Sequence, residues 1–337
     1  MTQQHIYPFT FGDMSQKDLL GGKGANLAEM VRIGLPVPPG FTIATTACRE
    51  YLKSGKFPEG LRKEISDSLS ALEKELGKTF GGVENPLLVS VRSGAKFSMP
   101  GMMETVLNVG ITPEVAQSMA DSSGNARFAW DSYRRFIEMY GKIVCDVDGE
   151  EFHKVQERII SAHGNTNLQE LDVEGLKALA DGFIKVIEAA TGKDFPTDPR
   201  EHLIDSIEAV FRSWNSERAT LYRRRERIPS DLGTAVNIQS MVFGNLSDDS
   251  GTGVAFTRNP SNGEIGSYGD YLQKAQGEDV VAGIRTPMSL DEFGALEPKV
   301  HGELEKIMVM LESHYRDLCD IEFTIERGKL YILQTRV

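Results

Sequence analysis

Two carboxylates, an amide and a guanidinium late in the sequence could together bind a metal ion and a phosphate. Asp320 and Glu322 are two residues apart, so on a β-strand both side chains project from one face. Gln334 and Arg336 repeat this spacing and can meet the carboxylates across a hairpin. Neighbouring carboxylates repel unless a cation lies between them. An oxygen-ligated ion such as Mg²⁺ and a simple cross-strand ion pair both remain open.

A second candidate is Arg92, within the sequence VSVRSGAKFSMPGMMETVLNVG at residues 89–110. An apolar strand over residues 87–91 is predicted to end at Arg92, because the Ser-Gly pair that follows is typical of a loop. The side chain is therefore expected at a strand end, where ligands commonly bind. Its guanidinium offers a fixed fork of donors that suits phosphate oxygens. A structural ion pair is the alternative.

Lys23 is a third candidate, because it lies in a Gly-Gly-Lys-Gly sequence before a helix predicted over residues 23–33. Glycines let a backbone approach a phosphate closely, and the helix N-terminus and the ammonium both add positive charge. The GxxxxGK[ST] pattern of a P-loop is absent. A turn that carries a solvated lysine remains the alternative.

The elements that must position these residues divide the chain into three parts. Residues 1–111 alternate helix and strand signals and are predicted to form an α/β lobe. Residues 112–197 have almost only helical periodicity and are predicted to form a helical insert. Residues 198–337 bring strands back and include a closing hairpin. Together these patterns predict an α+β protein.

Individual elements follow from periodicity, caps and turn residues. Helices are predicted over residues 46–54, 61–76 and 290–318, with helix starts at Asn125, Asp148 and Asp172 and a linker over 191–201. Strands are predicted over residues 41–43, 234–243, 253–257, 268–275 and 280–282, and a hairpin over 321–326 and 329–334 that turns at Arg327-Gly328.

Several segments resemble the N-terminal nucleotide-binding region of pyruvate phosphate dikinase. They are GGKGANLAEM (21–30), SGAKFSMPGMME (93–104), RFAWDSYRRFIEMYG (127–141), SGTGVAFTRNPSNGE (250–264), AQGEDVVAGIRTP (275–287) and DIEFTIERGKLYILQTR (320–336). The resemblance implies an ATP-grasp fold, in which two lobes with an inserted helical subdomain clamp a nucleotide.

The resemblance also implies roles for individual residues. Lys23, Arg92 and Arg336 would be the catalytic residues that hold the β and γ phosphates. Glu322 and Gln334 would coordinate Mg²⁺, with Asp320 bound to the ion directly or through water. The remaining residues expected to bind ATP are Gly101, Thr105, Val106, Gln239, Met241, Val242, Gly251, Thr252 and Gly253.

These remaining residues form three groups with different expected roles. The loop over residues 98–105 would cover the phosphates, with Gly101, Thr105 and Val106 as the contacting residues. Met241 and Val242 would pair with the adenine through their main chain. The SGTG sequence at 250–253 resembles a mobile glycine-rich loop, although a plain hairpin turn is the alternative. Gln239 could equally be a satisfied polar side chain in a core strand. Met99, Met102 and Met103 are either core side chains or an apolar bed for a base.

The whole enzyme of this family moves a pyrophosphoryl group from ATP to a histidine and then makes phosphoenolpyruvate from pyruvate. None of the six histidines lies in the Thr-Ser-His-Ala-Ala type of sequence that the family uses: His5, His153, His163, His202, His301 and His314. The expected partners are therefore ATP or AMP, a separate phosphohistidine domain and a pyruvate-binding barrel, in a full-length enzyme that is a candidate homodimer. Pyruvate, water dikinase and a noncatalytic ATP-binding module are the alternatives.

Composition is consistent with a cytoplasmic location. The net charge of −12 disfavours partners such as nucleic acid or an anionic membrane. No apolar run approaches the roughly 20 residues that span a bilayer, and no secretory signal is recognised. The three cysteines, Cys48, Cys145 and Cys319, are far apart and are expected to be reduced packing thiols. The basic run at 222–227 is expected to be a solvated helix face.

Overall fold

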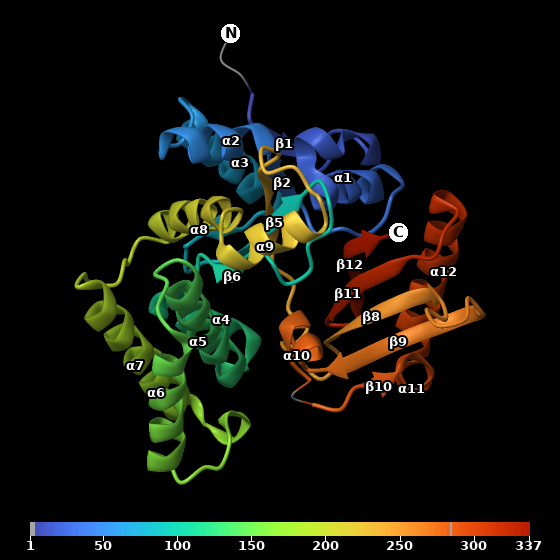
Figure 1. The fold of residues 1–337 in the computed structure, drawn as a ribbon. Helices are drawn as coiled ribbons and strands as arrows, with labels where there is room; N and C mark the ends of the chain where they lie inside the picture. Colours follow the sequence, from blue (N-terminus) through green and yellow to red (C-terminus); the bar gives the residue numbers. More distant parts are fainter. Residues whose placement is uncertain (1–3, 284) are drawn as a thin grey trace. The chain divides into compact units, whose positions relative to one another are not determined.

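The structure is a computed structural model that describes residues 4–283 and 285–337, and it has a mixed α+β architecture (Figure 1). The described residues form two compact units. The first unit takes in the described residues up to 8, with 16–24 and 40–241, and the second takes in those of 9–15, 25–39 and 242–337. Each unit contains an antiparallel five-stranded sheet.

The first unit surrounds a sheet of strand order β1-β2-β7-β5-β6. The strands of this sheet are β1 (Ile6–Pro8), β2 (Gly40–Ile43), β5 (Val89–Ala95), β6 (Thr105–Val109) and β7 (Thr234–Ser240). Two short strands, β3 (Thr79–Phe80) and β4 (Pro86–Leu87), pair with each other in a separate sheet. The helices after α1 (Lys17–Arg32) are α2 (Thr45–Ser54), α3 (Leu61–Leu76), α4 (Pro113–Ser123), α5 (Ala126–Ile143), α6 (Gly149–Ala162), α7 (Val173–Thr191), α8 (Pro199–Ser213) and α9 (Glu217–Arg225). The chain thus leaves the sheet after β6 and returns through β7 to its centre.

The predicted helix starts are confirmed. The side-chain oxygens of Asn125, Asp148 and Asp172 each accept a hydrogen bond from a main-chain N–H in the first turn of α5, α6 and α7. These bonds satisfy donors that have no partner inside the helix. Helix α5 packs against α4 and α7, and α8 packs against β5, β6 and β7.

The second unit contains a sheet of strand order β10-β9-β8-β11-β12. Its elements are β8 (Gly251–Arg258), β9 (Ile265–Gln273), α10 (Gly277–Ala282), β10 (Met288–Ser289), α11 (Leu290–Leu296), α12 (Pro298–Tyr315), β11 (Asp320–Glu326) and β12 (Lys329–Arg336). Helices α11 and α12 pack against this sheet (Figure 1). The core between them includes Tyr271, Phe293, Phe323 and Leu304.

Two element predictions in the second unit are wrong. Residues 280–282 lie in helix α10, although valines favour strands. The Asp279 carboxylate accepts a hydrogen bond from the main-chain N–H of Gln276 and so caps the start of this helix. The long helix predicted over 290–318 is two helices. Pro298 has no N–H to donate, so α11 ends before it and α12 begins with it.

The basic run at residues 222–227 is only partly a solvated face. Arg223 is buried, its guanidinium lies 4.1 Å from the ring centroid of Trp214, and it donates a hydrogen bond to the Trp214 carbonyl. The prediction failed for Arg223 because an arginine can be buried when an aromatic face and a carbonyl replace its water. Arg224 and Arg225 are exposed, as expected.

The cysteines are free thiols, as the spacing predicted. Burial raises the pKa of Cys48 to about 12, that of Cys145 to about 11 and that of Cys319 to about 12, so all three stay protonated near neutral pH. Among the helices of the described residues, none combines the length and the apolar composition that crossing a membrane requires.

His202 on α8 is the one histidine of the described residues that lies inside a cluster of aromatic rings. The ring centroids of Phe136, Tyr140 and Phe195 lie 5.0, 5.2 and 5.3 Å from its own. Its Nε2 donates to the Pro196 carbonyl at 2.6 Å, and its buried Nδ1 has no hydrogen-bond partner among the described residues. A second proton on Nδ1 would therefore be a buried donor without an acceptor.

This environment predicts a stability that falls at acidic pH. Burial lowers the pKa of His202, against smaller opposite effects of the Pro196 carbonyl, Asp205 and Asp198. As pH falls, the unfolded chain therefore binds the proton before the folded chain does. The stability that the neutral His202 ring provides is complete above about pH 6.5 and is lost as pH falls toward the pKa in the folded state. Urea unfolding from pH 8 to pH 5 should show a smaller pH dependence in His202→Gln than in the parent. The exposed His153→Gln is the matched control, and an unchanged slope in His202→Gln would contradict the assignment.

Candidate functional site

The sheet of the first unit has one apolar and one polar face. Pairing between its strands aligns Thr42 on β2, Asn237 on β7, Arg92 on β5 and Thr105 on β6 in a single row. Residues that alternate with this row are buried and apolar: Phe41, Ile43, Val91, Val106, Val236 and Ile238. Because side chains alternate between the faces of a sheet, the polar row occupies the face opposite this apolar core.

Hydrogen bonds organise the polar row. Thr42 Oγ1 donates to Asn237 Oδ1 at 2.8 Å, and both residues are buried. Arg92 Nη1 donates to Gln239 Oε1 at 3.4 Å. Gln239 is also buried, whereas Arg92 and Thr105 are partly exposed. The row therefore becomes accessible to a ligand at Arg92 and Thr105, and Gln239 helps to orient the guanidinium.

The Gly-Gly-Lys-Gly segment lies directly on this polar face. Gly21 has φ 68° and ψ 172°, so it breaks α1 and the helix restarts just before Lys23. A Cβ on Gly24 would lie 2.8 Å from both Asn237 Oδ1 and Thr42 Oγ1. A Cβ on Gly94 would lie 3.4 Å from Cβ of Lys23. The glycines are thus required for close helix–sheet packing, and that packing brings Lys23 to the face that carries Arg92.

The expectation that Arg92 ends a strand is wrong. Strand β5 continues to Ala95, and its ladder with β7 runs from the Val89–Ser240 pair to the Ala95–Thr234 pair. The Ser-Gly pair looked like a loop because these residues are rare in strands. Here a small residue is needed, because a Cβ at Gly94 would lie 2.5 Å from Asn237 Nδ2. Tertiary contact therefore overrides local preference.

The segment after β5 places its candidate residues differently. Gly101 has φ 69° and lies in a turn, and a Cβ on it would meet nothing within 4 Å. Thr105 on β6 pairs with Arg92 on β5. Val106 pairs with Val91 on the apolar face, so only its main chain could reach a ligand on the other face. Met99 packs with Trp214, and Met102 and Met103 lie against the same cluster. Met99 is thus a core side chain, and Met102 and Met103 are half-buried against the same cluster.

Met241 and Val242 follow β7 and were predicted to bind an adenine through their main chain. The N–H of Met241 donates to the Leu88 carbonyl at 2.8 Å. Met241 is the last residue of the first unit, and Val242 is the first of the final segment of the second. Their adenine-binding role stays a prediction.

In the second unit, the predicted hairpin register is confirmed. Asp320 pairs with Arg336, Glu322 pairs with Gln334, and Arg327-Gly328 forms the turn. Gln334 Nε2 donates to Glu322 Oε1 at 2.9 Å. Arg336 donates to the same oxygen at 3.3 Å and lies 3.5 Å from Asp320 Oδ2. The four side chains form one connected group, which we call the hairpin cluster.

The electrostatics of the hairpin cluster favour a cation. Burial raises the pKa of Asp320, the charge of Glu322 adds to this effect, and Arg336 opposes it. Within residues 4–283 and 285–337, no three His, Cys, Asp or Glu side chains gather as metal ligands. Two carboxylates and one amide oxygen nevertheless fit Mg²⁺, which typically uses one or two protein carboxylates and completes its shell with water and phosphate oxygens.

The SGTG sequence is neither a turn nor a loop, because Gly251, Thr252 and Gly253 open strand β8. A Cβ on Gly251 would lie 2.1 Å from the Tyr271 hydroxyl, and one on Gly253 would lie 2.6 Å from the Phe323 ring. These glycines make room for the aromatic core. Thr252 Oγ1 is 3.0 Å from the Phe323 carbonyl oxygen, to which it donates. A role of the three residues in ATP binding stays a prediction.

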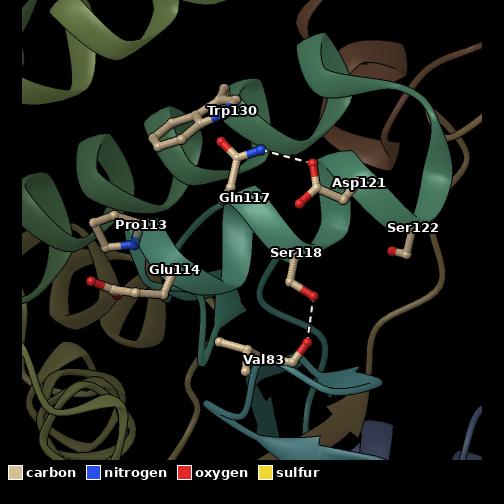
Figure 2. A pocket seen from close by; sticks show the side chains of 8 residues that line it. All are labelled: Val83, Pro113, Glu114, Gln117, Ser118, Asp121, Ser122 and Trp130. Atoms are coloured by element: carbon tan, nitrogen blue, oxygen red, sulfur yellow. Dashed lines mark hydrogen bonds between the residues drawn. The ribbon is translucent and has the colours of Figure 1, made fainter.

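A separate surface hollow of about 870 Å³ lies in the first unit (Figure 2). It is lined by Val83, Pro113, Glu114, Gln117, Ser118, Asp121, Ser122 and Trp130. Its charged groups are the carboxylates of Glu114 and Asp121, and Gln117 Nε2 donates to Asp121 Oδ1 at 2.9 Å. Carboxylates repel phosphates, and none of the predicted site residues lines the hollow. It is therefore a poor candidate for an anionic ligand.

The fold and these groups define an α+β domain in which cationic side chains from a strand and a helix lie on one face of the first sheet, and a carboxylate–guanidinium cluster lies on the second sheet. The family model described as "Pyruvate phosphate dikinase, AMP/ATP-binding domain" matches residues 17–57, 49–294 and 292–337. The chain belongs to this family.

Individual relatives agree with the family assignment. Pyruvate, phosphate dikinase of Clostridium symbiosum is 50% identical over 333 residues, which cover 98% of this chain and 38% of the relative. The protein of that name from Rhizobium meliloti is 51% identical over 96% of this chain and 38% of its own length. The chloroplastic protein of Arabidopsis thaliana is 49% identical over 100% of this chain and 35% of its own length. The chain thus spans less than two fifths of these relatives.

Sequence reasoning missed Asn237 and Thr42. Asn237 alternates with Gln239 in the sequence VNIQ, so the period of two residues could have placed both on one face. Nothing local marks Thr42, because its role depends on pairing with a strand almost 200 residues away in sequence.

The space around two helical glycines predicts that alanine will change the free energy of unfolding in opposite directions. One glycine packs on the polar row, and the other, on α12, is open. Gly24→Ala places a methyl group against Asn237 and Thr42 and should lower the free energy of unfolding by about 1–3 kcal/mol. Gly302→Ala on α12 meets nothing within 4 Å and should raise it by up to about 1 kcal/mol through helix propensity. Urea unfolding measures both. Stabilisation by Gly24→Ala would contradict the packing argument.

Proposed function

We propose that this chain binds Mg-ATP and is the nucleotide-binding part of a pyruvate, phosphate dikinase. The observation that carries the proposal is that Lys23 and Arg92 lie on the same polar face of the first sheet, which offers two cationic side chains there. Phosphoryl transfer depends mainly on positioning and charge neutralisation, which such groups supply. Membership of the AMP/ATP-binding family supports the choice of ligand.

Each group of residues has a role in this proposal. Lys23, Arg92 and Arg336 hold the β and γ phosphates. Glu322 and Gln334 bind Mg²⁺, and Asp320 binds it directly or through water. The metal, when bound, neutralises part of the phosphate charge. The hydrogen bonds from Gln334 and Arg336 to Glu322 support this assignment, because they keep the proposed ligands together on one face.

The finer features remain part of the proposal. The proposed fold is of the ATP-grasp type, with an N-terminal lobe over residues 1–111, a helical insert over 112–197 and a C-terminal part over 198–337. The other proposed ATP-binding residues are Gly101, Thr105, Val106, Gln239, Met241, Val242, Gly251, Thr252 and Gly253. In the whole enzyme, ATP, phosphate and pyruvate give AMP, pyrophosphate and phosphoenolpyruvate, and a histidine on another domain carries the transferred group.

The proposal predicts that Arg92 is required for ATP affinity. Loss of a charge-assisted bidentate contact should weaken Mg-ATP binding by about 1.5–3 kcal/mol, or roughly 10- to 150-fold. Calorimetric titration of Arg92→Ala tests this, with the exposed Arg225→Ala as the matched control. Arg92→Lys should recover only part of the affinity, because it keeps the charge without the fork. Parental affinity in a folded Arg92→Ala protein would remove Arg92 from the site.

The proposal also predicts that Glu322 acts through the metal. Glu322→Ala should weaken ATP binding more in the presence of Mg²⁺ than in EDTA, because the carboxylate is needed only when the ion is present. Titrations under both conditions measure the difference. Glu303→Ala, an exposed residue of α12, is the control. Equal losses with and without Mg²⁺ would mean that Glu322 only pairs with Arg336.

A further inference from the structure

Strand β12, which carries Gln334 and Arg336, lies at the edge of its sheet. Its inner side pairs with β11, with an irregularity at which Glu322 pairs with Gln334 and Phe323 pairs with Ile332. An edge strand has main-chain groups on its outer side that need other partners. The irregularity falls just before Gln334. The position of the main chain from Gln334 onward therefore depends strongly on the hydrogen-bond partners along the outer side of β12.

Residues 25–39, which belong to the same unit, supply these outer partners. The N–H of Ile332 donates to the Pro36 carbonyl at 2.9 Å. Asn26 Nδ2 donates to the Thr335 carbonyl at 3.1 Å. Asn26 therefore holds the main chain at the residue between Gln334 and Arg336.

Thr335 is held a second time by the same helix. Its Oγ1 donates to the sulfur of Met30 at 3.0 Å, and both residues are buried. Asn26 and Met30 are four residues apart, so they lie on one face of α1. Thr335 points to the core side of the sheet, so Gln334 and Arg336 project from the other side. Two successive turns of α1 thus fix the segment that presents these two side chains.

The amide orientation of Asn26 has a cost. Its Oδ1 is buried without a hydrogen-bond partner in the part of the chain that the structure describes. Rotating the amide would satisfy nothing, because it would set Oδ1 against the Thr335 carbonyl oxygen. A buried acceptor without a partner destabilises the fold. Stability alone therefore explains Asn26 poorly, whereas a requirement for its N–H donor explains it well.

We propose that Asn26 is a positioning residue of the phosphate site: its amide fixes the main chain at Thr335 and so sets the positions of Gln334 and Arg336. This rests on the proposed function, in which Arg336 holds the β and γ phosphates. Small displacements of such groups weaken binding strongly, because charged hydrogen bonds depend on distance and angle. Asn26 acts on the outer phosphates and leaves the contacts to the nucleoside and the α phosphate unchanged.

The test compares ATP with AMP, which lacks the outer phosphates. Calorimetric titration of Asn26→Ala should show about 3- to 10-fold weaker Mg-ATP binding, as expected for one lost hydrogen bond, and AMP binding within about twofold of the parent. Thr335→Val is the matched control. It removes only the weak hydrogen bond to the Met30 sulfur, keeps the carbonyl that Asn26 binds, and should weaken ATP binding less than Asn26→Ala does.

A double-variant cycle separates positioning from a general loss of stability. In an Arg336→Ala background, Asn26→Ala should weaken Mg-ATP binding by a smaller factor than it does in the parent, because one of the two groups that it positions is gone. Alanine favours helices, so folding of Asn26→Ala is expected, and Asn26→Ser serves if it does not fold.

The outcomes distinguish this inference from the proposed function. A parent chain that binds no Mg-ATP would overturn the proposed function, and the inference with it. A parent that binds Mg-ATP, beside an Asn26→Ala variant of equal affinity, would overturn the inference alone. Equal losses for ATP and AMP, or fully additive effects with Arg336→Ala, would show that Asn26 has only a structural role.

Discussion

The close approach of α1 to the polar face of the first sheet is the constraint on which the candidate phosphate site depends. Gly24 and Gly94 allow this approach, because a Cβ at either position would collide with Asn237. Asn237 is buried and bonded to Thr42, so it cannot easily move away. The packing that places Lys23 on the same face as Arg92 therefore depends on Asn237 and on the two glycines.

The sequence predicted those parts of the fold that local chemistry determines. Helix starts at Asn125, Asp148 and Asp172 and the hairpin turn at Arg327-Gly328 follow from capping and turn geometry. The pairing of Asp320 with Arg336 followed from a period of two residues and a known turn length. Such features need only neighbours along the chain or across one turn.

Predictions from the sequence were wrong where contacts between residues far apart in the chain determine the local structure. The Ser-Gly pair after Arg92 has the composition of a loop, but pairing with β7 continues strand β5 through these residues. Gly94 is needed there because a Cβ would collide with Asn237. The glycines of SGTG suggested mobility, but they accommodate Tyr271 and Phe323. In each case glycine marks close packing against a partner far away in sequence. Composition alone cannot separate this use of glycine from conformational freedom.

An acidic chain can still bind a polyanion if its cations are already arranged. In the hairpin cluster, the guanidinium of Arg336 is paired with the carboxylates of Glu322 and Asp320, so each of these three charges has an opposite charge beside it in the described structure. On the proposed function, these partners would be exchanged when Mg-ATP binds: the carboxylates would hold Mg²⁺, and the guanidinium would hold a phosphate. Each charge would then have an opposite charge both before and after binding, which would limit the desolvation penalty of binding. Such an exchange would need an acidic and a basic side chain on adjacent strands, as Asp320 and Arg336 are, because each must be the partner of the other when no ligand is bound.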